Sequence, residues 1–491
     1  MAEVNSDFAK FAVGDYTHFQ KTFTLDEFES FSSISGDSNE LHYNSDVAAS
    51  SEFGRPIVPL HLTIAPLSRV AGMCFPGPPS LYLSHSVKAI KPVFYNEELT
   101  YSARITAINQ THRVLSISVL AWRENEVVLT AEMQVQARTA TWSEPDAIPR
   151  HTSHDQPTAL ITGASGAIGA ALARNLARQG YRLLLHGNGN QSALETLSSK
   201  CKAFGVETRS FLGPLDNEQS AREFAEWSVS DWSPDLVIHA ACPPLHSDIN
   251  TLVAVNYTAL RVLMDKITPC FLKRQSGNLV LVSSTAVKTN PTGWEDYVAA
   301  KTMATSLVSG FQQRHSQYGL HGTVIAPGYV KSPFSDGLFT ENVPAMLPEE
   351  VAEGVSKCLL GPLAGKTYYE IGVGGIQAGQ YEFQPASASP SVDASEQPKP
   401  VPATQDLASV SPSSTDISLK LRQLFMRFFN TSSEDEVTHA SLGVTATWDS
   451  LRHIELLLLL ENEFSTNFTS DEISQTQDFR SIHNLLLSKA G

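Results

Sequence analysis

The stretch that decides the fold runs from Thr158 to Gly180 and reads TALITGASGAIGAALARNLARQG. An apolar segment leads into a glycine-rich turn over residues 162–169, and a helical segment begins directly after the turn. Glycines in such a turn let the backbone approach a pyrophosphate, whose negative charge the helix N-terminus stabilises. A glycine pattern alone also fits an ordinary tight turn, so the choice depends on residues further along the chain.

Around this stretch, apolar strand-like segments alternate with helical ones from about residue 157 to residue 378. The strand-like segments are TALITG, RLLLHG, DLVIHAA, NLVLVSS, GTVIAPG and YYEIGVG. Strands that are apolar throughout are buried on both faces, which is typical of parallel sheets covered by helices. The alternation therefore predicts a parallel α/β sheet.

A second set of residues indicates chemistry at this sheet. Tyr297 and Lys301 lie four residues apart in YVAAK, which places both side chains on one face of a helix. Ser284 ends the strand NLVLVSS, and Asn256 lies further upstream. Hydride transfer to a ketone leaves an alkoxide that needs a proton. A tyrosine supplies that proton when a neighbouring cation lowers its pKa, while a serine hydroxyl holds the carbonyl oxygen. The alternative is an exposed Tyr–Lys pair without a catalytic role. The glycine-rich turn, Asn256, Ser284 and the Tyr–Lys pair follow one another in this order along the chain, which argues against that alternative.

These motifs resemble the short-chain dehydrogenase/reductase family, and within it the 3-oxoacyl-carrier-protein reductases. The resemblance implies a Rossmann fold, that is, a doubly wound parallel sheet, with a catalytic tetrad of Asn256, Ser284, Tyr297 and Lys301. It implies cofactor contacts from Thr162, Gly163, Ser165, Gly166, Ile168, Gly169, His186, Asn188, Ala240, Tyr297, Lys301, Pro327 and Gly328.

One feature departs from the family's motif, and another indicates which cofactor is bound. The family's Asn-Asn-Ala-Gly stretch is replaced by His-Ala-Ala-Cys at residues 239–242, so we expect cofactor binding to survive and substrate access to differ. After the second strand the sequence reads HGN at residues 186–188, with no carboxylate to hold a ribose 2′-hydroxyl. NADPH is therefore favoured over NADH.

The N-terminal region carries a different constellation in ISGDSNELHYN, residues 34–44. Asp37 and His42 are five residues apart, and a carboxylate and an imidazole that share one water can add it to a double bond next to a thioester, or remove it. The alternative is a turn with an ordinary loop histidine. The strand-like segments that follow predict an α+β unit.

Residues 11–139 resemble the MaoC-like (R)-specific enoyl hydratases, whose hot-dog fold wraps an antiparallel sheet around a helix. Asp37, Asn39 and His42 match that family's signature, and Ser68 falls where its active-site serine belongs. Glu40 replaces the usual proline, and Pro-Leu at residues 59–60 replaces a His-Gly pair. The resemblance implies dehydratase or hydratase activity; a structural, substrate-gripping or dimerising domain is the alternative.

The C-terminal region follows a stretch rich in Pro, Ala and Ser, which we expect to be a flexible tether. Ser450 follows Asp449 at the start of an acidic, apolar-faced helix in WDSLRHIELLLLLENEF. Such a serine is commonly only an N-cap. However, this small helical region resembles an acyl carrier protein, a four-helix domain, which implies that Ser450 carries 4′-phosphopantetheine.

The predicted segments are a hot-dog domain at 1–141, a linker at 142–156, a reductase at 157–383, a flexible linker at 384–415 and a carrier at 416–491. Together they predict NADPH-dependent reduction of a 3-oxoacyl thioester to 3-hydroxyacyl, followed by dehydration to trans-2-enoyl. The alternatives are a reductase with carrier that stops at 3-hydroxyacyl, and a non-enzymatic carrier scaffold.

Composition limits the partners and the compartment. A net charge of −16 argues against nucleic acid. No apolar run is long enough for a membrane, and no secretion signal or close cysteine pair is visible, so we expect a cytoplasmic protein without a metal. Expected partners are acyl thioesters, a phosphopantetheinyl transferase, an external ketosynthase, an acyl-releasing or acyl-transferring enzyme and further copies of this chain.

Overall fold

The computed structural model describes residues 8–138, 151, 156–338, 343–360 and 365–379. In the C-terminal part it describes 414–429, 478–490 and isolated positions between them. The chain divides into two compact units, Met1–Ala386 and Ser387–Gly491. The predicted linkers fall almost entirely outside the described residues, as does Ser450. Within the described residues, no helix is long and apolar enough to cross a membrane.

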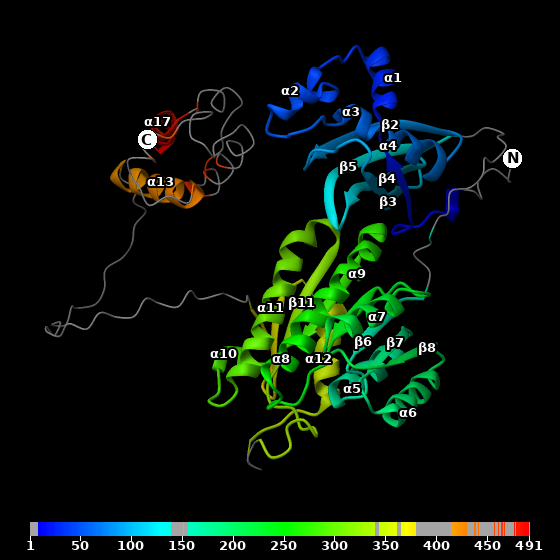
Figure 1. The fold of residues 1–491 in the computed structure, drawn as a ribbon, viewed down its shortest axis with the longest axis vertical. Coiled ribbons are helices and arrows are strands. Elements are labelled where there is room, and N and C mark those ends of the chain that lie inside the picture. The colour runs from blue at the N-terminus through cyan, green and yellow to red at the C-terminus, as the bar shows by residue number, and fades with distance from the viewer. Residues whose placement is uncertain are drawn as a thin grey trace, which may run out of the picture. The chain divides into compact units, whose positions relative to one another are not determined.

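The first unit begins with an antiparallel sheet around a helical segment, which is the hot-dog arrangement (Figure 1). Its helical elements are η1 (Phe8–Lys10), α1 (Leu25–Ser35), η2 (Glu40–His42), α2 (Ser45–Ala49), α3 (Leu60–Ile64), α4 (Pro66–Arg69) and η3 (Val70–Cys74). Its strands are β1 (Tyr16–Thr22), β2 (Ser80–Ala89), β3 (Glu98–Asn109), β4 (Val114–Arg123) and β5 (Glu126–Ala137), in the order β1-β3-β4-β5-β2. Leu67, Val70 and Cys74 on the central helical segment are buried against Ile117 and Val119 of β4 and their neighbours.

The second part of this unit is an eight-stranded sheet in the order β13-β12-β11-β10-β9-β6-β7-β8, in which only β13 is antiparallel. Its strands are β6 (Thr158–Thr162), β7 (Arg182–Gly187), β8 (Thr208–Leu212), β9 (Leu236–His239), β10 (Gly277–Val282), β11 (Leu320–Pro327), β12 (Tyr368–Gly372) and β13 (Gly375–Gly379). Its helical elements are α5 (Ala167–Arg178), α6 (Gln191–Lys202), α7 (Glu218–Ser228), α8 (Ile249–Val253), η4 (Ala254–Thr258), α9 (Ala259–Arg274), α10 (Ala286–Thr289), α11 (Glu295–His315), η5 (Ser316–Tyr318) and α12 (Pro348–Leu360). The predicted parallel α/β sheet is confirmed.

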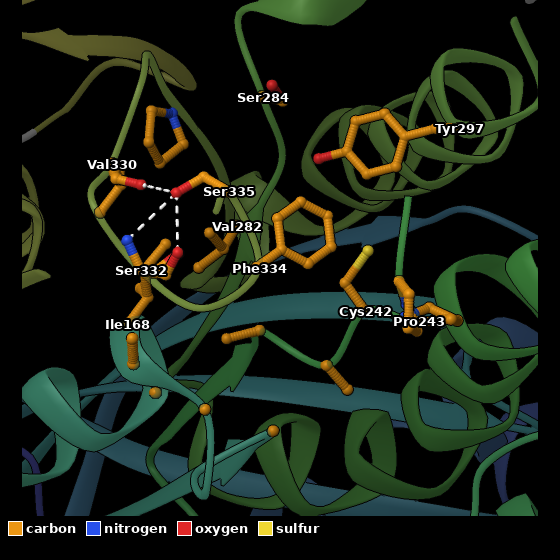
Figure 2. A pocket seen from close by; sticks show the side chains of 18 of the residues that line it. Ile168, Cys242, Pro243, Val282, Ser284, Tyr297, Val330, Ser332, Phe334 and Ser335 are labelled. Carbon is orange, nitrogen blue, oxygen red and sulfur yellow. Dashed lines mark hydrogen bonds between the residues drawn. The ribbon is translucent and has the colours of Figure 1, made fainter. Parts of the chain in front are cut away.

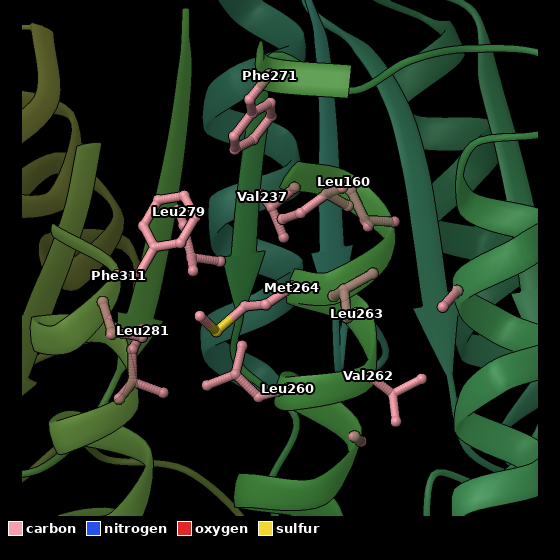
Figure 3. Packing of buried hydrophobic residues seen from close by; sticks show 14 of the residues in the cluster. Leu160, Val237, Leu260, Val262, Leu263, Met264, Phe271, Leu279, Leu281 and Phe311 are labelled. Carbon is pink, nitrogen blue, oxygen red and sulfur yellow. The ribbon is translucent and has the colours of Figure 1, made fainter. Parts of the chain in front are cut away.

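The apolar strands of this sheet are buried on both faces because successive side chains point to opposite sides. Leu160 of β6 and Val237 of β9 belong to the core under α9 and α11, whereas Ile161 and Ile238, one position later, belong to the core under α5 and α12. Figure 3 shows the first of these cores, where side chains from neighbouring strands meet those of α9. This two-sided burial explains why the strand sequences carry no polar alternation.

Helix α9 also contacts the hot-dog sheet. Leu120 and Trp122 of β4 are part of the same apolar core as α9. At the C-terminal end of α9, the Gln275 side-chain amide donates hydrogen bonds to the backbone carbonyls of Ser102 and Ser118, both at 3.0 Å. Ser102 Oγ in turn donates to the carbonyl of Leu272 at 2.9 Å. The hot-dog and reductase parts therefore share a core and a hydrogen-bond network within one unit.

In the second unit, α13 (Ser414–Phe429) and α17 (Phe479–Ala490) pack through apolar side chains. The rings of Phe425 and Phe479 meet edge to face with centroids 4.9 Å apart. Ser418 Oγ and His483 Nε2 are 2.6 Å apart and share a hydrogen bond. Within the predicted carrier domain, α13 and α17 are the helices whose bounds the structure describes.

Candidate functional site

A cavity of about 1130 Å³ opens at the C-terminal ends of the parallel strands of the reductase part (Figure 2). Most of the residues that the sequence nominated for the cofactor or the chemistry line it: Gly163, Ser165, Gly166, Ile168, Gly169, His186, Asn188, Ala240, Ser284, Tyr297, Lys301, Pro327 and Gly328. The strand order reverses beside β6, between β7 and β9, and ligands of open α/β sheets bind at such a point. Thr162 and Asn256 do not line the cavity.

The glycine-rich turn has a geometry that only glycine allows. Gly163 has a φ of +67°, and a Cβ placed on it would lie 2.7 Å from the Cα of Ala241. A Cβ on Gly169 would lie 2.3 Å from the carbonyl oxygen of Gly163. These positions leave the backbone of the turn bare at the start of α5, which is the cradle that a dinucleotide pyrophosphate requires.

His186, nominated as a cofactor contact, has both ring nitrogens engaged by backbone. The amide of Gly163 donates to Nδ1 at 3.2 Å, so Nε2 carries the proton and donates to the carbonyl of Gly213 at 3.0 Å. Burial lowers the pKa of His186 to about 4, and the imidazole is neutral at pH 7. His186 therefore holds the turn in place from the end of β7.

Thr162 and His239 form a buried network behind the cavity that the sequence did not reveal. Thr162 Oγ1 accepts the amides of Ala240 and Ala241, both at 3.1 Å, and donates to His239 Nδ1 at 3.1 Å. His239 Nε2 then donates to the carbonyl of Val255 at 3.1 Å. Burial lowers the pKa of His239 to about 3. The network ties the ends of β6 and β9 to the π-helical turn η4.

Asn256 lies in η4, next to Val255, and is completely buried. Its side-chain amide donates to the carbonyl of Leu252 at 2.9 Å, whereas its Oδ1 has no partner among the described atoms. A buried acceptor of this kind is a natural place for an internal water. Asn256 thus lies behind the cavity rather than on its wall.

Ser284, Tyr297 and Lys301 meet where β10 ends and α11 begins. Lys301 is buried and donates from Nζ to the carbonyl of Val282 at 2.9 Å. The pKa of Tyr297 lies above its ordinary value: burial is the main cause, the thiol of Cys242 adds to it, and a hydrogen bond with Ser284 opposes it. The sequence argument expected the lysine to lower this pKa, but burial dominates. The phenol is therefore protonated, which is the form that delivers a proton.

The substrate side of Tyr297 is lined by residues that sequence reasoning did not select. Trp294 meets the Tyr297 ring edge to face at 5.9 Å, and Phe334 lies 6.1 Å from it on a segment after β11. Cys242, three residues after the end of β9, also lines the cavity. The replacement of the family's glycine at residue 242 was the one sequence signal for this group.

In the hot-dog part, Asp37 and His42 lie close together. Asp37 Oδ2 is 3.7 Å from His42 Nε2, and His42 Nδ1 donates to the carbonyl of Ile57 at 2.8 Å, which orients the ring so that Nε2 faces the carboxylate. Asn39 caps η2 by accepting the amide of Leu41 at 3.1 Å, which is a structural role.

Ser68 and Tyr95 complete the inventory of this region. Ser68 is exposed on α4, and no described hydrogen bond joins it to Asp37 or His42. Tyr95 was not selected from the sequence, yet its hydroxyl is buried with no partner among the described atoms. Burial raises the pKa of Tyr95, and the nearby Asp37 carboxylate raises it further. The structure thus adds a phenol to the surroundings of Asp37.

Comparisons with known proteins agree with both parts. A family model described as short chain dehydrogenase matches residues 157–342, and one described as MaoC like domain matches residues 11–121. Nodulation protein G of Rhizobium meliloti is 31% identical over 189 residues, which are 37% of this chain and 75% of that protein. The 3-oxoacyl-[acyl-carrier-protein] reductase FabG of Staphylococcus aureus (strain Mu50 / ATCC 700699) is 24% identical over 201 residues, 39% of this chain and 82% of that protein.

Among solved structures, a short-chain dehydrogenase from Sphingobium yanoikuyae in complex with NADPH aligns with 40% of this chain and 82% of its own, at 23% identity and a TM-score of 0.38. The family match over 157–342, together with a relative that is 31% identical and three-quarters covered, shows the membership. This chain belongs to the short-chain dehydrogenase family and carries a MaoC like domain ahead of its reductase part.

Proposed function

We propose that this chain reduces a 3-oxoacyl thioester to a 3-hydroxyacyl thioester with NADPH and then dehydrates it to the trans-2-enoyl thioester. The observation that carries the proposal is the buried Tyr297, which lines one cavity together with Ser284, Lys301 and the glycine-rich turn. In this proposal the reductase and hot-dog parts act in sequence on one acyl chain.

The residues present fit a dinucleotide. The bare backbone at Gly163 and Gly169 leaves room for the pyrophosphate at the start of α5. At the end of β7 the cavity is lined by Asn188, where a carboxylate would repel a 2′-phosphate. The absence of a carboxylate at this position supports NADPH over NADH. When bound, NADPH supplies the hydride that converts the ketone into an alkoxide.

The chain's own residues then handle the oxygen and the proton. Ser284 Oγ accepts the amide of Ala286 at 3.1 Å, which orients its hydroxyl toward Tyr297 and the substrate oxygen. Tyr297 gives its proton to that oxygen as the negative charge develops. Lys301, anchored on the carbonyl of Val282, supplies the cation that stabilises the tyrosinate left behind.

The hot-dog part would remove water from the 3-hydroxyacyl product. His42, held by Ile57, and Asp37 lie close enough to share the proton taken from C2 and the proton given to the departing C3 hydroxyl. The loss of one hydrogen and one hydroxyl yields the enoyl thioester and one water. The second candidate is a reductase that stops at 3-hydroxyacyl, which the exposed Ser68 and the leucine at residue 60 favour.

The test compares products of the full chain and two variants, Tyr297→Phe and Asp37→Asn, given a 3-oxobutanoyl thioester and NADPH. We expect the parent to yield the enoyl product, Asp37→Asn to accumulate 3-hydroxyacyl, and Tyr297→Phe to bind NADPH without turnover. Reduction at the parent rate by Tyr297→Phe would refute the reductase proposal. An enoyl product from Asp37→Asn would remove Asp37 from the dehydration.

We also propose that Ser450 carries 4′-phosphopantetheine, which would keep the acyl group at high effective concentration near both parts. The support is its place after Asp449 in a small unit in which α13 and α17 pack. With coenzyme A and a phosphopantetheinyl transferase, the parent and a Ser465→Ala control should each gain one group by intact mass. Ser450→Ala should gain none, and any gain would overturn the assignment.

A second copy of this chain is the proposed partner at the β2 edge of the hot-dog sheet, since the described residues leave that strand unpaired on one side. Leu81 and Leu83 on it are each 46% exposed. Long apolar edge strands invite pairing with another strand. Sedimentation should give at least a dimer, and a concentration-independent monomer would contradict this. Condensation and acyl release are proposed to come from separate enzymes.

A further inference from the structure

Cys242 projects its side chain into the reductase cavity at the position where the resemblance expects a glycine without one. It lies three residues after the end of β9 and lines the same cavity as Tyr297. Figure 2 shows its sulfur directed toward the Tyr297 side of the cavity and beside the ring of Phe334. A ketone bound at Tyr297 would therefore occupy the cavity that this sulfur also lines.

Cys242 is partly buried and has apolar neighbours. It packs against the apolar cluster that contains Tyr297, Leu245 and Ala286, as Trp294 also does. The Tyr297 ring is flanked by Trp294 at 5.9 Å and Phe334 at 6.1 Å between centroids. Trp294, Phe334 and the sulfur of Cys242 thus lie around Tyr297 in the cavity, and we call this part of it the substrate passage.

We propose that Cys242 is a specificity-determining residue that narrows this passage, so that the reductase prefers 3-oxoacyl thioesters without a branch at C2. The inference rests on the proposed reduction and adds the shape of the substrate. With the carbonyl oxygen at Ser284 and Tyr297, C2 lies one bond from the reacting carbon, and the proposal places it on the Cys242 side of the passage. A methyl branch there displaces the thiol or tilts the carbonyl away from Tyr297.

The size of the effect follows from the size of the group. One methylene-sized difference in a pocket changes kcat/KM by about 10–200-fold. Replacing the cysteine by glycine removes the CH₂–SH group and leaves the backbone that the family's own glycine would have. We therefore expect Cys242→Gly to raise the branched-to-unbranched ratio of kcat/KM by about tenfold or more.

The experiment uses the full chain, NADPH and two N-acetylcysteamine thioesters, 3-oxobutanoyl and 2-methyl-3-oxobutanoyl. The matched control is Cys270→Ser, which removes a partly exposed thiol of α9 that does not line the cavity. The ratio should rise in Cys242→Gly and stay at the parent value in the control. If Cys242→Gly melts like the parent and binds NADPH yet keeps the parent ratio, the inference is overturned. If the parent reduces neither thioester, the proposed function itself fails and the inference falls with it.

Alkylation gives a second readout. Cys74, Cys201 and Cys358 are buried, so N-ethylmaleimide should react first with Cys242 and Cys270. A bulky adduct on Cys242 fills the passage, and the parent and Cys270→Ser should both lose reduction. Cys242→Ala should keep its own starting rate under the same treatment. Full activity of a parent whose Cys242 is alkylated by mass would contradict the narrow passage.

Discussion

The hydroxyl of Tyr95 is an unsatisfied polar group beside the Asp37–His42 pair of the hot-dog part. A buried hydroxyl without a partner costs about 1–3 kcal/mol, so a fold tolerates it where something else is gained. The Tyr95 hydroxyl is such a group, and Asp37 lies near enough to raise its pKa. A water held between Asp37 and His42 would satisfy this hydroxyl. We therefore interpret Tyr95 as a positioning residue for that water.

Tyr95→Phe removes the hydroxyl and keeps the ring. We expect the melting temperature to stay level or rise, because an unsatisfied polar atom disappears, and the hydration of a crotonyl thioester to fall by about tenfold or more, because the water loses a partner. Tyr82→Phe is the matched control, since Tyr82 also has a buried hydroxyl without a described partner in the same domain. Equal hydration rates in the two variants would assign Tyr95 a packing role only.

The residues that the sequence located best are those whose spacing encodes their position. An i, i+4 pair on a helix places Tyr297 and Lys301 on one face, and the structure buries both at the cavity. The roles of His186 and His239 were not predictable, because each depends on a carbonyl distant in sequence, at Gly213 and at Val255. Single-chain patterns carry no information about such partners.

At the scale of elements, the apolar runs predicted the parallel strands, and the elements that were not predicted are those with mixed composition. Strand β1 reads YTHFQKT and has polar residues on both faces, yet it pairs with β3 along its whole length. Strand β8 reads TRSFL and lies at the edge of its sheet. Pairing partners rather than intrinsic preference determine such strands.

Gln275 is where one element joins two domains. It ends α9 with a φ of +50°, which is unusual for a residue other than glycine, and its side chain bonds β3 and β4 of the hot-dog sheet. Its backbone carbonyl also accepts from Arg104 Nη1 at 2.7 Å. One residue that is 5% exposed therefore makes several of the hydrogen bonds across the interface, beside the apolar core that α9 shares with β4.

Gln275→Ala should lower the free energy of unfolding by about 1–3 kcal/mol, because the carbonyls of Ser102 and Ser118 lose a buried donor. Urea denaturation measures the loss. The transition should broaden, because the two domains would then unfold at different urea concentrations. Gln110→Ala, at an exposed position outside this interface, should leave the midpoint unchanged. Equal midpoints for the two variants would show that apolar packing of α9 alone holds the domains together.

At the scale of the whole molecule, buried histidines make the stability of the fold depend on pH. Burial is the main cause that lowers the pKa of His18, His186 and His315 to about 4 and that of His239 to about 3. Well above pH 6.5 these groups are neutral both folded and unfolded, so they contribute nothing there to the pH dependence. Below pH 6.5 the unfolded chain takes up protons that the folded chain excludes, and stability falls until the folded pKa values are reached.

We therefore expect the free energy of unfolding to drop as the pH falls from 6.5 to 5, a window in which ordinary carboxylates remain ionised. A fully buried histidine such as His239 contributes up to about 1.4 kcal/mol per pH unit, and the partly exposed His18 contributes less because solvent screens it. Urea titrations at pH 7.5, 6.5, 5.5 and 5.0 measure the slope. His315→Gln should reduce the slope, because burial lowers the pKa of the His315 imidazole and its Nδ1 has no described partner. His112→Gln, at an exposed position, should leave the slope as it is.

A slope that is the same in all three chains would place the origin of acid sensitivity outside His315. A parent whose stability is flat from pH 7.5 to 5 would show that these imidazoles are not held neutral by the fold.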